Sequence, residues 1–160
     1  MTDRRSSAIA GQDAVISLLG PTGKSTGMPI SEGMRNIVEA MQANGVMRLI
    51  ATATPSASDP HDRFSLPFWL AIRMIKALAG TAYADITAEV DVIRTSQLDW
   101  TIVRLPWLTS KPNPRRAVAG YVGDPRIKLF FLSRQRLAEF VVEQLTDPTW
   151  RRTAPAISNG

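Results

Sequence analysis

A glycine-lysine-serine triplet is the first stretch of this sequence whose residue types could bind phosphate. Gly23, Lys24 and Ser25 follow the apolar run VISLL, as the end of a P-loop follows its strand. A P-loop also needs a glycine five residues before the glycine of its Gly-Lys pair, because the backbone N–H groups between the two glycines surround the phosphates. Leu18 stands at that position, and Gly20 is too close to replace it. The sequence therefore argues against an ATPase or GTPase.

Metal and disulfide chemistry have few candidate side chains. The chain has no cysteine and one histidine, His61, which excludes disulfides, thiolate metal sites and multi-histidine metal sites. His61 stands between Pro60 and Asp62, and we expect it to be a solvent-facing loop residue. No metal site is predicted.

The net charge of +5 and the isoelectric point of about 10.2 raise the question of an anionic partner. The basic residues are dispersed in short pairs, with no basic helix face and no aromatic-plus-basic stacking motif, so we expect no nucleic-acid partner. No apolar run reaches about 18 residues, which predicts no membrane partner. No apolar signal core follows the first basic residues, and the absence of cysteine fits a reducing compartment, so a cytoplasmic location is expected.

Alternating strands and helices must position any site. We expect buried strands over 14–19, 46–54 and 98–105, the first of them buried on both faces. Helices are expected from a cap at Ser31 to Gly45, and over 64–79, 82–96 and 133–146; two short β-like pieces, 117–122 and 126–132, flank a turn at 123–125. This order predicts one α/β domain over 1–160 with a parallel sheet.

The carboxyl ends of these strands are the expected place for a site. Ligands of parallel α/β sheets bind beyond the strand carboxyl ends. Residues 19–21, 53–55 and 104–107 each lead from a buried strand into glycine or proline. We therefore look for function there.

Four segments resemble a known family: AIAGQDAVISLLGP, SEGMRNIVEAMQANGVMRLIATAT, VIRTSQLDWTIVRLPWL and SRQRLAEFVVEQLTD. They are similar to successive segments of the atypical short-chain dehydrogenases/reductases, in the NmrA-like, NAD(P)H-binding branch that includes biliverdin-IXβ (flavin) reductase. The resemblance covers about residues 8–157. It implies a Rossmann-type parallel sheet flanked by helices, NADP or NAD as cofactor, and hydride transfer to a small flavin-like, quinone-like or carbonyl substrate.

The resemblance also implies which residues bind the cofactor. They follow the three strand ends: Leu19, Gly20, Pro21, Ala53, Thr54, Leu105, Pro106, Trp107 and Leu108. Thr54 stands where the family places a hydroxyl beside the nicotinamide, and a hydroxyl donor there would stabilise charge that develops on the substrate. Trp107 replaces the histidine of the biliverdin-reducing relative, which argues against tetrapyrrole chemistry.

Two single residues and one apolar segment are further candidates for a role in the site when the chain is compared with the same family. Tyr83 lacks the lysine of a Tyr-x-x-x-Lys dyad, because Thr87 stands four residues on; we expect a packing or substrate-lid role. Arg104 is expected to be either a site residue or a structural ion-pair partner. An apolar segment is placed over the substrate pocket, although core packing or a dimer contact explains it equally well; it comprises Phe64, Pro67, Phe68, Trp69 and Ile72.

The sequence departs from the family at the dinucleotide fingerprint. No G-x-G-x-x-G or close variant occurs, although the cofactor pyrophosphate normally rests on that loop and its helix. We therefore expect an N-terminally truncated, incomplete domain in which cofactor binding is impaired. The alternatives are a non-catalytic NAD(P)-sensing or protein-interaction module, and a gene product without function. A homodimer also stays open.

Overall fold

A five-stranded sheet forms the centre of the computed structural model, which describes residues 8–20, 27–128 and 130–160. Its strands, in spatial order, are β1 (Ala14–Ser17), β2 (Arg48–Ala53), β3 (Asp99–Arg104), β7 (Ala156–Asn159) and β5 (Ala117–Gly120). β1, β2, β3 and β7 are parallel, whereas β5 is antiparallel to β7. The predicted α/β class with a parallel sheet is confirmed, with one antiparallel strand at its edge.

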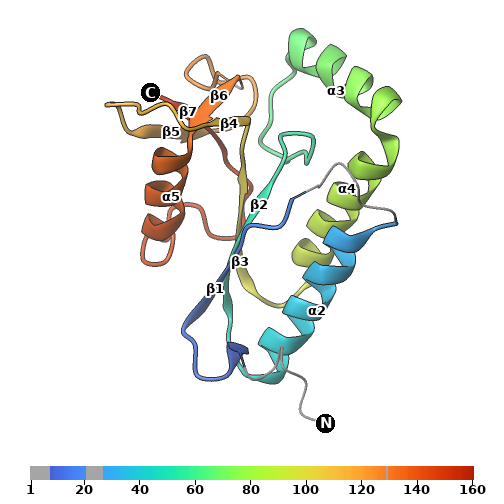
Figure 1. Cartoon of the computed structure of the whole chain (residues 1–160), viewed down its shortest axis with the longest axis vertical. Coiled ribbons are helices and arrows are strands. Elements are labelled where there is room, and N and C mark those ends of the chain that lie inside the picture. Colours follow the sequence, from blue (N-terminus) through green and yellow to red (C-terminus); the bar gives the residue numbers. More distant parts are fainter. Residues whose placement is uncertain (1–7, 21–26, 129) are drawn as a thin grey trace.

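Helices cover both faces of this sheet. α2 (Pro29–Ala43) and α4 (Gly80–Thr95) lie along one face, and α5 (Arg134–Glu143) lies on the other (Figure 1). α3 (Leu66–Leu78) leads into α4 at the top of the view, and β4 (Trp107–Thr109) pairs with β6 (Phe131–Ser133) in a small parallel sheet. Within the described ranges, no helix has both the length and the apolar character needed to cross a membrane.

The alternation of side chains along the strands divides the core into two clusters. Leu49 and Ile102 point toward α2 and α4, where they pack with Met34, Met41 and Ile93. Their neighbours along the strands point the opposite way, toward α5, in a cluster that includes Ile50, Val103, Phe140, Val141 and Ile157. Each face of the sheet is thus buried against its own layer of helices, as a sheet covered on both sides requires.

The first strand corrects one sequence prediction. β1 was expected to be buried on both faces, but Ile16 is 39% exposed and only Ser17 is buried. In the described part of the chain β1 pairs with β2 alone, so it is an edge strand. Val15 packs against the α2–α4 cluster, and Ile16 lies on the opposite face.

The start of α2 corrects a second prediction. Ser31 was expected to cap this helix, but the helix begins at Pro29 and Ser31 lies within its first turn. The cap comes from α4 instead: the Asp85 carboxylate accepts the backbone N–H of Ile30 at 3.0 Å and of Ser31 at 2.8 Å. Burial would raise the pKa of Asp85, but these hydrogen bonds outweigh it and hold that pKa below its ordinary value.

Candidate functional site

The three strand ends indicated by the sequence meet at one edge of the sheet. Ser17 is in register with Ala51, and Ala53 is in register with Arg104. Beyond the last strand residue, the backbone N–H of Leu105 donates to the carbonyl of Ala53 at 3.0 Å. The segments that follow β1, β2 and β3 therefore leave the sheet side by side.

Among the described residues after β1, none crowds the backbone at Gly20. Leu19 is 37% exposed, and a Cβ added at Gly20 would meet no heavy atom within 4 Å. No protein contact among the described residues therefore demands glycine at position 20. Pro21, also predicted to bind cofactor, and the Gly-Lys-Ser triplet at 23–25 lie outside the described residues.

A hydroxyl pair follows β2. Thr54 is half-buried, and its Oγ1 lies 2.5 Å from the Oγ of Ser56; either hydroxyl can be the donor. Ala53, the last residue of β2, is buried in the α2–α4 cluster. The sequence pattern identifies Thr54 as a candidate site residue but does not identify Ser56. Ser56 lies in the turn-rich stretch PSASDP, where a serine is typical of a loop and does not by itself predict a site.

The segment after β3 contributes mainly apolar groups. Pro106 is buried, and Leu105 and Leu108 pack partly buried against the α5 cluster. The Trp107 side chain is 79% exposed and stands opposite Phe131 in the β4–β6 pair. These positions put all four residues at the strand edge, while their contacts with a cofactor stay predictions.

Arg104 is a structural ion-pair partner. Its side chain is fully buried, and its two terminal nitrogens donate to the Asp62 carboxylate at 2.6 and 2.7 Å. The same guanidinium donates to the carbonyl of Ala57 at 2.9 Å and to that of Ala154 at 2.6 Å. The pair thus fastens the loop after Thr54 to β3 and to the segment before β7, which fixes the loop that carries the hydroxyl pair.

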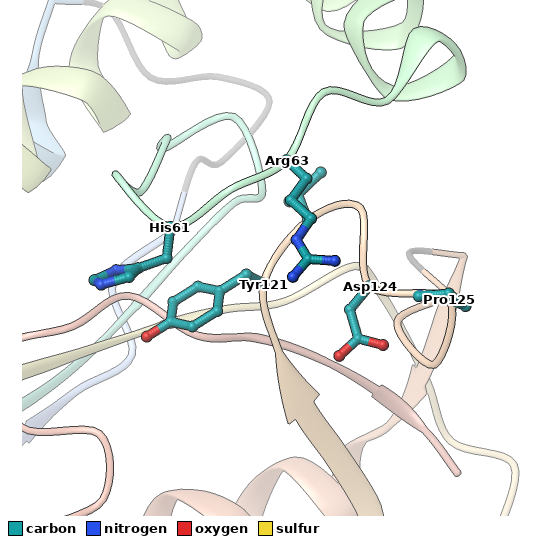
Figure 2. Close-up of a pocket in the computed structure, with 6 residues that line it drawn as sticks. His61, Arg63, Tyr121, Asp124 and Pro125 are labelled. Carbon is teal, nitrogen blue, oxygen red and sulfur yellow. The ribbon is translucent and has the colours of Figure 1, made fainter.

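A cavity of about 440 Å³ lies beside this loop, and its lining includes both sequence neighbours of Asp62. Figure 2 shows His61, Arg63, Tyr121, Asp124 and Pro125 around it. The His61 ring is exposed, as predicted, and stacks on the Tyr121 ring with their centroids 4.8 Å apart. Arg63 and Asp124 bring opposite charges to the opposite wall, so the lining has no single sign of charge.

Buried Asp59 anchors the histidine. Its carboxylate accepts the backbone N–H of His61 at 3.0 Å, lies 2.8 Å from Nδ1 of the ring, and accepts the backbone N–H of Ala154 at 2.9 Å. Burial would raise the pKa of Asp59, but the His61 and Ala154 hydrogen bonds and the Arg104 charge outweigh it and lower that pKa. Asp59 and Asp62 therefore hold both ends of this turn.

The turn at 123–125 was predicted from the sequence, and it closes the cavity on one side. The backbone N–H of Arg63 donates to the carbonyl of Val122 at 2.8 Å, which brings the two loops together. Gly123 has φ of +88°, and a Cβ there would lie 2.8 Å from the Cβ of Arg63. Both the backbone conformation and the close approach require glycine at this position.

The Tyr83 region has a threonine where a dyad lysine would stand. Thr87 Oγ1 donates to the carbonyl of Tyr83 at 2.9 Å, so this side chain serves the backbone of α4. The Lys76 ammonium, from α3, lies 5.5 Å from the centre of the Tyr83 ring. This contact is with the face of the ring, and it does not recreate the Tyr-x-x-x-Lys dyad.

The core-packing explanation for the apolar segment at 64–72 is wrong. No residue of α3 is buried; Phe64 is 79% exposed and Trp69 44% exposed, while Phe68 and Ile72 are half-buried. Core packing would remove these side chains from water, and the fold leaves them in contact with it. A substrate contact and a dimer contact both stay predictions.

A mostly parallel sheet, covered by helices and open at its carboxyl edge, is the arrangement of the Rossmann-like nucleotide-binding class. The family model for NAD(P)H-binding proteins matches residues 2–148. The chain therefore belongs to this NAD(P)H-binding family.

Solved structures share the fold at low sequence identity. A short-chain dehydrogenase/reductase from Veillonella parvula, in complex with NADP, has a TM-score of 0.71 and 21% identity over 97% of this chain and 66% of its own. ChuY from Escherichia coli O157:H7, described as an anaerobillin reductase, has a TM-score of 0.72 and 17% identity over 97% of this chain and 69% of its own. A search of curated proteins gave no match. The chain thus spans about two thirds of the length of these two proteins.

Proposed function

We propose that this chain presents the nicotinamide- and substrate-facing part of an NAD(P)H-dependent reductase site. The observation that carries the proposal is the Thr54–Ser56 hydroxyl pair at the carboxyl edge of a Rossmann-like sheet, beside Gly20, where no described residue fills the space next to the backbone. The family supports a nicotinamide dinucleotide as cofactor, and the NADP complex of the Veillonella parvula protein favours NADP.

The chain's own groups fit the nicotinamide end of such a cofactor. A bound nicotinamide supplies the hydride. Each hydroxyl of the pair has one hydrogen, and one hydroxyl donates to the other, which leaves a single O–H free to donate to a substrate oxygen. That donor stabilises negative charge on the oxygen as hydride arrives. No protein acid is assigned, so the proton comes from water.

The pyrophosphate end of the cofactor has no matching cradle in this sequence. Nicotinamide dinucleotides are held by a glycine-rich turn at a helix N-terminus, and no G-x-G-x-x-G occurs among the 160 residues. This supports weak cofactor binding by the chain alone, with a dissociation constant of about 1 mM rather than micromolar.

An exposed aromatic pair supports a flat, conjugated substrate. Trp107 and Phe131 stand opposite each other across the β4–β6 pair and are 79% and 62% exposed. Aromatic faces of this kind stack on planar rings. A flavin-like or quinone-like acceptor therefore suits this edge better than a small aliphatic carbonyl.

A non-catalytic NAD(P)-sensing module is the second candidate, and the Tyr83 region favours it. A short-chain dehydrogenase uses a tyrosine–lysine dyad as its acid, and the side chain in the lysine position here bonds to the helix backbone instead. Hydride transfer from reduced nicotinamide mononucleotide to menadione separates the candidates. A reductase site accelerates it, whereas a sensor binds the nucleotide without accelerating it.

The proposal is tested by mapping where nicotinamide binds. We expect millimolar reduced nicotinamide mononucleotide to shift the backbone amide NMR signals of Gly20, Thr54, Ser56 and Leu105. Thr54→Val keeps the size of the side chain and removes the hydroxyl, so the rate of hydride transfer to menadione should fall about fivefold to tenfold. Thr95→Val, on the exposed end of α4, should leave this rate unchanged. Shifts confined to other residues, or an unaffected Thr54 variant, would contradict the proposal.

A further inference from the structure

A continuous apolar ridge runs along the outer side of α3. Leu66, Leu70, Met74 and Leu78 are spaced four residues apart, so they lie on one side of the helix. They are 55%, 54%, 59% and 81% exposed, and no other residue of this helix is buried either. The helix stands at the top of Figure 1, away from the sheet. Four large apolar side chains on one exposed helix are more than scattered surface residues.

The segment of sequence that carries the ridge has cations and no acidic residue. Between Asp62 and Asp85 the sequence contains three cationic residues, Arg63, Arg73 and Lys76, and neither aspartate nor glutamate. Arg73 and Lys76 lie on α3 itself and are exposed. The chain as a whole also carries a net charge of +5.

Both helix cations rest on aromatic rings. The Arg73 guanidinium lies 4.9 Å from the centre of the Trp69 ring, and the Lys76 ammonium lies 5.5 Å from that of Tyr83. Trp69 thus lies against the Arg73 guanidinium on the helix that carries the ridge. Aromatic and long cationic side chains of this kind have an apolar body and a polar tip, which suits the boundary between hydrocarbon and water.

The size of the ridge argues against a second protein molecule as its main partner. The helix has 13 residues and is therefore about 20 Å long, and one face about 10 Å wide offers about 200 Å². Stable protein interfaces bury about 800 Å² on each partner. A two-fold dimer through α3 would also bring the same cations together with no acidic residue to pair them. A bilayer needs neither a large matched surface nor a shaped partner.

We propose that α3 docks this protein on an anionic lipid bilayer. The ridge of Leu66, Leu70, Met74 and Leu78 enters the boundary between headgroups and acyl chains, while Arg73 and Lys76 stay at the level of the lipid phosphates. This is peripheral binding, distinct from a membrane span, and it departs from the sequence prediction of no membrane partner, because that prediction rested on the length of apolar runs alone. It would place the open strand edge close to apolar acceptors that dissolve in lipid, although docking itself does not depend on the reductase proposal.

Co-sedimentation with vesicles tests this proposal. We expect the 160-residue chain to bind vesicles of equal parts phosphatidylcholine and phosphatidylglycerol, and to bind pure phosphatidylcholine far more weakly. Arg73→Gln with Lys76→Gln should weaken binding to the anionic vesicles about twenty-five-fold, because each cation near such a surface contributes about fivefold. Leu70→Gln with Met74→Gln should weaken it at least about tenfold, since both side chains leave water on docking.

Two matched double variants serve as controls. Arg35→Gln with Arg115→Gln removes two positive charges from exposed sites outside α3. Met47→Gln with Val142→Gln removes two exposed apolar side chains outside α3. Both should bind vesicles as the unchanged chain does. Because all these side chains are exposed, circular dichroism should show every variant folded. The proposal is overturned if the unchanged chain ignores anionic vesicles, if the ridge variant binds as well as its control, or if the ridge instead mediates a dimer without lipid.

Discussion

Replacing Arg104 with methionine is expected to lower the free energy of unfolding by about 3–5 kcal/mol. The guanidinium is fully buried, and its loss leaves the Asp62 carboxylate without its charged partner and two backbone carbonyls, of Ala57 and Ala154, without their donor. Breaking one side of a buried ion pair typically has this cost. Domains are stable by about 5–15 kcal/mol, so urea denaturation should show a large fall in the midpoint.

A second substitution shows whether the unpaired Asp62 carboxylate causes the loss of stability. Arg104→Met combined with Asp62→Asn leaves no unpaired carboxylate, and we expect it to be less destabilised than Arg104→Met alone. Arg126→Met breaks an exposed ion pair with Asp124, and its midpoint should stay close to that of the unchanged chain. Asp62→Asn alone is measured as well. If the double variant lost as much stability as Arg104→Met and Asp62→Asn added together, the buried ion pair would not explain the effect.

Glu89 should make the protein less stable as the pH rises from about 5 to about 8. This carboxyl lies on α4, is 1% exposed, and its Oε1 has no hydrogen-bond partner among the described residues. Burial, together with the charge of Asp85, raises its pKa from 4.5 to about 8. Between these two values the folded chain holds a proton that the unfolded chain releases, so the free energy of unfolding falls with rising pH.

The size of that fall is about 3–5 kcal/mol over the whole window, since a pKa difference of one between the folded and unfolded chain corresponds to about 1.4 kcal/mol. Glu89→Gln has nearly the same shape and does not titrate, so its stability should stay level from about pH 5 to 8 and exceed that of the unchanged chain at pH 8. Glu39→Gln, on the exposed side of α2, is the matched control and should keep the slope. Equal slopes in the Glu89 variant and the unchanged chain would show that another group is responsible.

Local patterns explain how much of the fold the sequence could predict. The apolar runs at β2 and β3 and the periodic helix at α5 lie within a few residues of their expected bounds. β7 was missed because it has four residues and follows Pro155, which leaves little apolar pattern. The two β-like pieces near the 123–125 turn do contain strands, but β5 joins β7 and β6 joins β4. Pairing between distant segments is a tertiary property that no local pattern encodes.

The same distinction applies to the site. The strand ends and the glycine or proline residues that follow them could be predicted from short stretches of sequence. The parallel sheet then brings these strand ends to one edge. The Asp62 partner of Arg104 lies 42 residues away, and the Asp85 cap of Ser31 lies 54 residues away, so neither partner could be inferred from spacing. The exposure of α3 was also beyond the sequence, because an apolar helix usually predicts burial.

The nicotinamide end of the cofactor is the part that this chain should bind, without a site for the pyrophosphate. The most direct measurement compares the dissociation constants of NADPH and reduced nicotinamide mononucleotide, obtained from the same amide NMR shifts on the same protein. We predict that both are about 1 mM and differ by less than about threefold, because the added pyrophosphate and adenosine find no cradle. Micromolar binding of NADPH, or no binding of the mononucleotide at the strand edge, would contradict this assignment.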